Sequence, residues 1–208
     1  VHPETQNDPA SWYTRSFAYF HVYKQAGQYN TLKLSELDTA LSSALMSVKL
    51  DTAKTYINEN NSIIKNGAIY YYKISTVLLQ DSLDYLKSEK FYDKYKKYTA
   101  MIDPAFDFKQ KDINYYNTTG GIFADKYMKN NFNQKYGNKK KNALLKVLEL
   151  DSKNISANIN LGILYYNQGA TLMKMMDYDV DLAQLDVIQE NAKKLFKQSL
   201  PFMIKVYE

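Results

Sequence analysis

NINLGILY, at residues 158–165, carries the pattern on which the fold prediction depends: a glycine four positions after the first residue and an aromatic ring three positions further on. A small residue inside a helix lets a neighbouring helix approach closely, and an aromatic ring one turn away fills the space beside it. Three related segments are WYTRSFAY (12–19), IIKNGAIY (63–70) and YNTTGGIF (116–123). Three of the four copies begin with a bulky residue. Because one hairpin cannot bury both of its faces, the four copies predict a stacked array of helical hairpins.

Several helix boundaries are visible in the sequence. Asp8-Pro9 predicts a helix start, since Asp is a good N-cap and Pro is tolerated in the first turn. Asp103-Pro104 predicts a helix end, since Pro cannot continue the hydrogen-bond ladder. Between residues 37 and 50, apolar side chains recur every three or four positions, which predicts a helix that partners the first one. A polar break at 151–154 predicts a new helix from about Ile155.

The expected fold class is all-α. No stretch sustains the alternation of apolar and polar residues that a half-buried strand needs, and we expect about eight helices in four irregular hairpins. Pro201 falls within the last of these helices, because Phe196, Ser199 and Phe202 continue a largely apolar helical stripe across it. We expect a kink there, since Pro removes one backbone donor and clashes with the preceding turn.

The copies are widely spaced. Their small residues, Ser16, Gly67, Gly120 and Gly162, are 51, 53 and 42 residues apart, against about 34 in a tetratricopeptide unit. The excess is expected between or beyond the helices, where insertions cost little. The expected units are roughly 9–51, 53–104, 111–152 and 155–208, in a single domain spanning 1–208.

Ala192 and Phe196, followed by Ser199, match the second-helix signature A-x3-F, and Asp103-Pro104 matches the usual end of a unit. On these motifs and the four copies, the chain resembles a divergent tetratricopeptide repeat (TPR) protein of the bacterial type with lengthened hairpins. The resemblance implies an αα-hairpin superhelix, or solenoid, that binds other proteins, and it favours the bacterial periplasm or cell envelope over the cytoplasm. The departures from the pattern are Arg15, Asn66 and Thr119 in place of Leu, and Asn158 in place of Trp.

Composition agrees with one globular body. The chain has 208 residues, 45% of them hydrophobic, no Cys, and a formal net charge of +5. It contains no apolar run of about 18 residues, so no membrane span is expected. The absence of Cys excludes disulfides and thiolate chemistry but fits either redox compartment. The start at Val1, without Met, is typical of a processed or truncated piece.

Enzyme signatures are sparse. His2 and His21 are the two imidazoles, and His21 is expected to have a structural or groove-lining role rather than a catalytic one. The phosphate-binding, dinucleotide-binding and zincin motifs do not occur. We therefore expect no enzyme activity and no cofactor.

One acidic cluster has the spacing of metal ligands. Asp177, Asp179 and Asp181 match the first ligands of an EF-hand loop, which then requires Gly at its sixth position and Glu at its twelfth. Those positions hold Leu182 and Ile188. An EF-hand is therefore excluded and no metal site is assigned, with a looser calcium site as the alternative to a solvated acidic insertion.

The stretch FYDKYKKY (91–98) interleaves aromatic residues with lysines. Such a pattern is able to stack bases and neutralise phosphates. It is equally the pattern of an amphipathic helix with buried aromatics and exposed lysines, which we favour because the positive charge of the chain is scattered. RNA binding therefore remains the less favoured alternative.

In tetratricopeptide proteins the first helix of each hairpin lines a concave groove, and the resemblance assigns a mostly aromatic and amide-bearing set to that surface. Tyr71, Tyr72 and Tyr166 are the expected anchors of a bound peptide or protein segment, since tyrosine offers a large contact area at low entropic cost. An assembly module that packs through its ends and inserted loops is the alternative function. The implied groove residues are Tyr13, Phe17, Phe20, His21, Ile64, Tyr71, Tyr72, Asn117, Asp125, Ile163, Tyr166 and Asn167.

Overall fold

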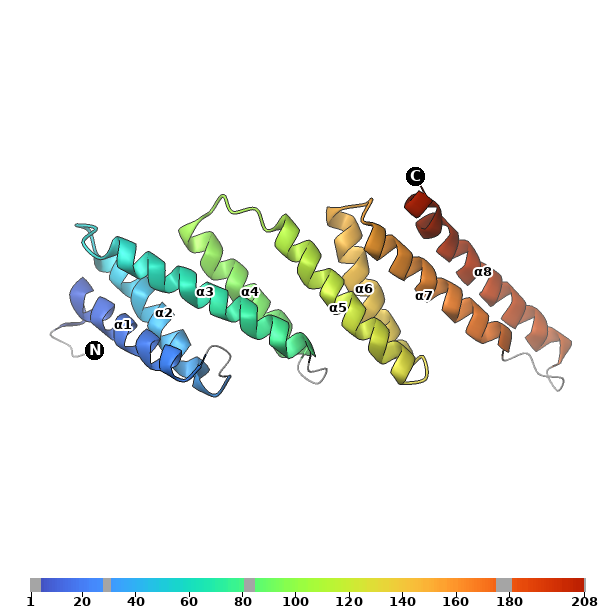
Figure 1. Cartoon of the computed structure of the whole chain (residues 1–208), viewed down its shortest axis with the longest axis horizontal. Helices are drawn as coiled ribbons and strands as arrows, with labels where there is room; N and C mark the ends of the chain where they lie inside the picture. Colours follow the sequence, from blue (N-terminus) through green and yellow to red (C-terminus); the bar gives the residue numbers. More distant parts are fainter. Residues whose placement is uncertain (1–4, 28–30, 81–84, 175–180, 208) are drawn as a thin grey trace. The chain divides into compact units, whose positions relative to one another are not determined.

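In the computed structural model, residues 5–27, 31–80, 85–174 and 181–207 are described. They form eight α-helices and one short 3-10 turn, with no strand among them (Figure 1). The predicted all-α class is therefore confirmed. The elements are α1 (Pro9–Gln25), η2 (Thr31–Lys33), α2 (Leu34–Leu50), α3 (Ile57–Gln80), α4 (Tyr85–Ile102), α5 (Lys109–Lys129), α6 (Gln134–Leu150), α7 (Ile155–Lys174) and α8 (Leu182–Tyr207).

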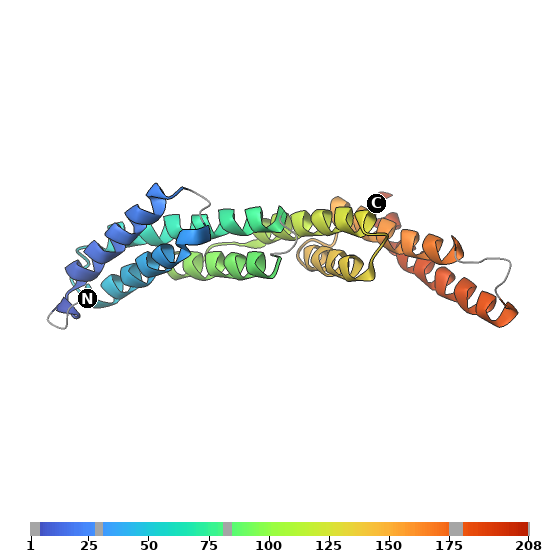
Figure 2. The ribbon, with the colours of Figure 1, turned by 90° about the horizontal axis from the view of Figure 1, so that it is seen from below.

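The helices pack mainly in pairs that are adjacent in sequence: α1 with α2, α3 with α4, α5 with α6, and α7 with α8. The two helices of a pair lie side by side and run in opposite directions (Figures 1 and 2). The sequence predicts one domain, whereas the structure divides into two compact units, 1–107 (unit 1) and 108–208 (unit 2). In unit 1, α3 also contacts α1 and α2, and in unit 2, α7 also contacts α6.

The predicted boundaries are found where the capping residues place them. The Asp8 carboxylate accepts hydrogen bonds from the backbone N–H groups of Ala10 and Ser11, and α1 starts at Pro9. Helix α4 ends at Ile102, directly before Asp103-Pro104, and α7 begins at Ile155. The hydrogen bonds to Asp8 satisfy two backbone N–H groups that a helix leaves unpaired in its first turn.

The first helices of the four pairs begin at residues 9, 57, 109 and 155, so successive pairs start 48, 52 and 46 residues apart. Ser16 and Gly162 are each the eighth residue of their helix, whereas Gly67 is the eleventh residue of α3 and Gly120 the twelfth of α5. The second and third sequence copies therefore lie about one helical turn later than the first and fourth. A displacement of about one turn moves a copy along its helix but leaves it on nearly the same face.

Small residues mark the places where helices cross closely. The Ser16 hydroxyl donates to the carbonyl of Ala40 in α2 at 2.9 Å, and the Ser199 hydroxyl donates to the carbonyl of Gly162 at 2.8 Å. A Cβ added to Gly67 would lie 2.5 Å from a Leu41 methyl carbon. Close approach is thus the structural role of the small residues, as the sequence pattern predicts.

Helix α8 continues through Pro201, as predicted. Few of its residues are buried, namely Ala192 and Ser199, which both face α7. Much of its remaining surface is open, including the large apolar side chains of Leu200 and Ile204.

Candidate functional site

A groove of about 530 Å³ runs between α1 and α3 in unit 1. Its α1 wall is mostly aromatic and its α3 wall is mostly polar. The lining residues are Tyr13, Phe17, Phe20, His21 and Lys24 from α1, and Asn58, Glu59, Ser62, Ile63 and Asn66 from α3. We call this the α1–α3 groove.

The α1 wall results from helical spacing, because residues three or four apart share one face of a helix. Phe17 is 56% exposed at the middle of this wall and stacks on the His21 imidazole with ring centroids 6.4 Å apart. Tyr13 stacks on Tyr56, which precedes α3, at 5.1 Å. Phe20 is buried against the core. The wall is therefore a preformed apolar surface whose rings are supported by neighbouring rings.

The α3 wall presents a row of exposed polar side chains, Asn58, Ser62 and Asn66, four residues apart. The Asn66 amide group donates to the backbone carbonyl of Ser62 at 2.8 Å, which fixes its orientation. Successive members of the row are about 6 Å apart along the helix axis, at about 1.5 Å per residue. Ile63, buried between the two walls, supplies an apolar floor.

The groove carries little net charge. Its lining contains one cation, Lys24, and one anion, Glu59. The Lys24 ammonium lies 6.0 Å from the centre of the Phe20 ring, so part of its field is directed at an aromatic face. The Gln25 side-chain amide donates a 2.9 Å hydrogen bond to the Nε2 atom of His21. Such a surface selects a partner by shape and hydrogen bonding more than by charge.

The four α1 members of the predicted set, Tyr13, Phe17, Phe20 and His21, all line this groove. The three α3 members do not. Instead, the α3 wall is formed by residues that the sequence reasoning missed. The signal for it was present as the repeated four-residue spacing of Asn58, Ser62 and Asn66.

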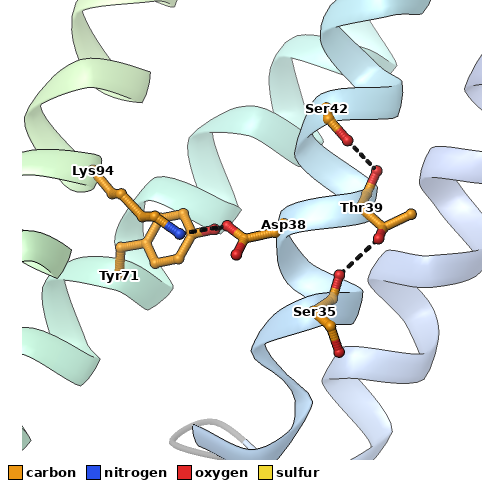
Figure 3. A network of polar contacts seen from close by, with 6 residues as sticks. All are labelled: Ser35, Asp38, Thr39, Ser42, Tyr71 and Lys94. Atoms are coloured by element: carbon orange, nitrogen blue, oxygen red, sulfur yellow. Dashed lines mark hydrogen bonds and ion pairs between the residues drawn. The ribbon is translucent and has the colours of Figure 1, made fainter. Parts of the chain in front are cut away.

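Ile64 is predicted to line the groove and Tyr71 to be one of its anchors, and the structure corrects both predictions, because both side chains are buried. The Tyr71 hydroxyl donates to the Asp38 carboxylate of α2, and Lys94 of α4 pairs with the same carboxylate at 2.6 Å (Figure 3). Burial, together with this hydrogen bond, raises the pKa of Tyr71 far above its ordinary value. Tyr71 therefore stabilises the junction of α2, α3 and α4 and is not accessible to a partner.

Tyr72 is half-buried against α4, where its ring lies 5.1 Å from that of Tyr95 and 6.1 Å from that of Tyr92. Its role is mainly one of packing. The positions of α3 that match the groove positions of α1 are thus directed at α2 and α4, whereas the groove is lined by the side of α3 that faces α1.

The remaining predicted residues lie in unit 2. Tyr166 and Ile163 are exposed on α7, and the Tyr166 ring packs against that of Phe196 in α8 at 5.5 Å. Asn167 is half-buried. Asp125 is exposed on α5 and pairs with Lys129 at 2.7 Å.

Asn117, on the same helix as Asp125, is half-buried and donates to the Asn154 side chain at 3.4 Å.

The aromatic and lysine-rich stretch 91–98 lies on α4. Tyr92, Tyr95 and Tyr98 are buried, while Lys97 is exposed and Lys94 and Lys96 are half-exposed. This is the arrangement of the favoured amphipathic helix. With their rings in the core, these tyrosines are not placed to stack on bases.

The acidic cluster lies partly outside the described residues, which include Asp181 but not Asp177 or Asp179. His2 also lies outside them. Across the described ranges, no three His, Cys, Asp or Glu side chains are grouped to hold a metal ion. No described helix is both long and apolar enough to cross a bilayer.

Comparison of the chain with protein-family models, with curated proteins and with solved structures gives no match.

Proposed function

We propose that the chain is a non-catalytic protein-interaction module of the tetratricopeptide type, and that the α1–α3 groove binds an extended segment of a partner protein. The observation that carries the proposal is the pairing of an aromatic wall with a hydrogen-bonding wall across one groove. This combination suits a peptide, which has apolar side chains and a polar backbone.

The spacing of the polar wall supports an extended segment. In an extended peptide, residues on one side recur about every 6.6 Å, close to the spacing of about 6 Å between members of the Asn58, Ser62 and Asn66 row. Backbone N–H and C=O groups of the peptide would meet amide and hydroxyl groups at nearly matching intervals. Alternate side chains would then face the rings of Tyr13 and Phe17.

The aromatic wall is expected to supply most of the affinity. Phe17 is exposed in the free protein, so a bound peptide that covers its ring gains the free energy of burying apolar surface. The ring is already held by stacking on His21, so binding costs little additional side-chain entropy. The single Lys24 and Glu59 at the rim would affect mainly the association rate.

The test uses the full chain and a displayed library of random peptides, from which binders are selected and measured by fluorescence polarisation. Phe17→Ala should weaken the selected peptides by about 30-fold or more, which corresponds to about 2 kcal/mol. Val22→Ala is the matched control, since Val22 is also exposed on α1 but does not line the groove. Equal affinities for the two variants would show that the groove is not the binding site.

The exposed apolar residues of α8 support the assembly module as a second candidate. Leu200, Ile204 and Tyr207 are exposed, Tyr207 by 92%. Sedimentation velocity separates the candidates, because an assembly module forms concentration-dependent oligomers whereas the groove proposal requires only a monomer. Salt-dependent binding of single-stranded RNA, with no peptide binding, would favour the third alternative.

A further inference from the structure

A second recess of unit 1, of about 470 Å³, lies where η2, α2, α3 and α4 meet. It is separate from the α1–α3 groove and shares no lining residue with it. Its apolar part is formed by Leu32, Leu34, Leu78 and Phe91. Leu32 is 89% exposed at the mouth, whereas Leu78 is buried at the base. The recess therefore offers an apolar surface that runs from solvent into the core.

The charge of this recess is one-sided. Lys87, Lys90 and Lys94 line it from α4, and none of its described lining residues is acidic. Residues three or four apart lie on the same face of a helix, so the three ammonium groups border the same opening. The methylene stems of the lysines add apolar surface beneath their charged ends.

Lys94 is held in position by its surroundings. Its ammonium pairs with Asp38 at 2.6 Å (Figure 3) and lies 5.6 Å from the centre of the Phe91 ring. Asp38 does not itself line the recess. Because the Asp38 carboxylate offsets the charge of Lys94, the exposed Lys90 contributes the more available positive charge. An exposed cation above an apolar base is the electrostatic complement of an anion attached to an apolar body.

We propose that this recess binds a small amphiphilic anion, such as a monoacyl carboxylate, with its apolar chain against Leu34 and Leu78 and its acidic head near Lys90 and Lys94. The volume falls within the range of about 300–1,000 Å³ that is typical of small-molecule sites, which are mainly apolar with a few polar groups that fix orientation.

The test is titration of the full chain with decanoate below its micelle-forming concentration, near neutral pH, followed by calorimetry. One decanoate is expected to bind per chain. Decanol, with the same chain and an uncharged head, should bind about three- to ten-fold more weakly, and decyltrimethylammonium more weakly still, because the head group meets lysines. Equal binding of all three probes would overturn the proposed role of the lysines.

Two variants at exposed positions locate the site without risk to the fold. Lys90→Gln should weaken decanoate by about three- to ten-fold while leaving decanol unchanged. Leu32→Ser should weaken both. Lys65→Gln, the same charge change on the exposed face of α3, is the control. If decanoate binds all variants equally, the site lies elsewhere.

Sedimentation with phosphatidylglycerol vesicles distinguishes a free amphiphile from a membrane surface. Capture by these vesicles without binding of monomeric decanoate would overturn the proposal. Peptides selected for the α1–α3 groove should bind the Lys90→Gln variant normally, so failure of one site is distinguishable from failure of the other.

Discussion

The crossing of α7 with α8 and the crossing of α5 with α6 bring helices together in different ways. At the first, the Ser199 hydroxyl donates to the Gly162 carbonyl at 2.8 Å. At the second, the branched side chain of Leu144 lies over Gly120, so that an added Cβ would be 2.6 Å from a leucine methyl carbon. Both crossings are closely packed, because a Cβ added to Gly162 would lie 2.6 Å from the Met203 sulfur. The first, hydrogen-bonded crossing has in addition a buried bond between its helices at the glycine, whereas at the second, shape-fitted crossing the glycine is covered by an apolar side chain. Loss of the hydrogen bond leaves the packing of the first crossing in place, whereas a larger residue at Gly120 must displace Leu144 or the helix that carries it.

The largest effect is expected at the shape-fitted crossing. Gly120→Leu should destabilise unit 2 by about 1–3 kcal/mol or more, because the new side chain overlaps Leu144 in a closely packed position. Thermal unfolding followed by circular dichroism measures the change. Gly121 is the adjacent control, with no atom within 4 Å of an added Cβ, and Gly121→Ala should stabilise α5 by about 0.5–1 kcal/mol. If both changes shift the melting temperature in the same direction, the packing described for Gly120 is wrong.

A smaller effect is expected at the hydrogen-bonded crossing. Ser199→Ala should destabilise the chain by about 0.5–1.5 kcal/mol, because it removes one buried donor while the Gly162 carbonyl keeps its place in α7. Gln198→Ala, at an exposed neighbouring position, should change the free energy of unfolding by less than about 0.5 kcal/mol. Urea denaturation of the two variants measures the difference. Equal midpoints would show that the Ser199 hydrogen bond does not stabilise the fold.

The smallest effect concerns Lys140, which is 5% exposed on α6. Burial lowers the pKa of its ammonium below the ordinary 10.5. At pH values below the lowered pKa, the folded state holds a charged group at a cost that the unfolded state does not bear. As pH rises through the folded pKa toward 10.5, that cost disappears, so the contribution of Lys140 to stability becomes less unfavourable.

Lys140→Met should therefore stabilise the protein at neutral pH, and its advantage over the wild type should shrink in the window between the lowered pKa and 10.5. Chemical denaturation of both proteins across this range measures the difference directly, since the titration of every other group is shared. If the stability advantage of Lys140→Met grows with pH, the folded-state pKa of Lys140 is not lowered.

The sequence predicted the class of the fold and several helix ends because these depend on local chemistry. Asp8-Pro9 and Asp103-Pro104 act through capping and through the missing proline donor, which require no knowledge of distant residues. The α1 side of the groove was predicted for a similar reason, since its residues are three or four apart and so share one face of a single helix.

The α3 side was not predicted, because the groove is lined by the side of α3 that faces the preceding pair, whereas the matching of the copies selects the side that faces α2 and α4. Gly67 packs against Leu41 of the preceding pair, a contact between elements that no local pattern reveals. Aligning copies by the glycine therefore selected Tyr71, whose partners Asp38 and Lys94 come from two other helices. Division of the chain into two units is likewise a property of contacts between helices.

The preference of each helix for its neighbour in sequence has a consequence for how the chain is made. A pair such as α1 and α2 is complete as soon as its second helix has emerged from the ribosome, and it does not have to wait for distant segments. Contacts between segments close in sequence also favour rapid folding. Apolar surface is thus covered progressively during synthesis, which limits the time in which a nascent chain exposes it to other chains.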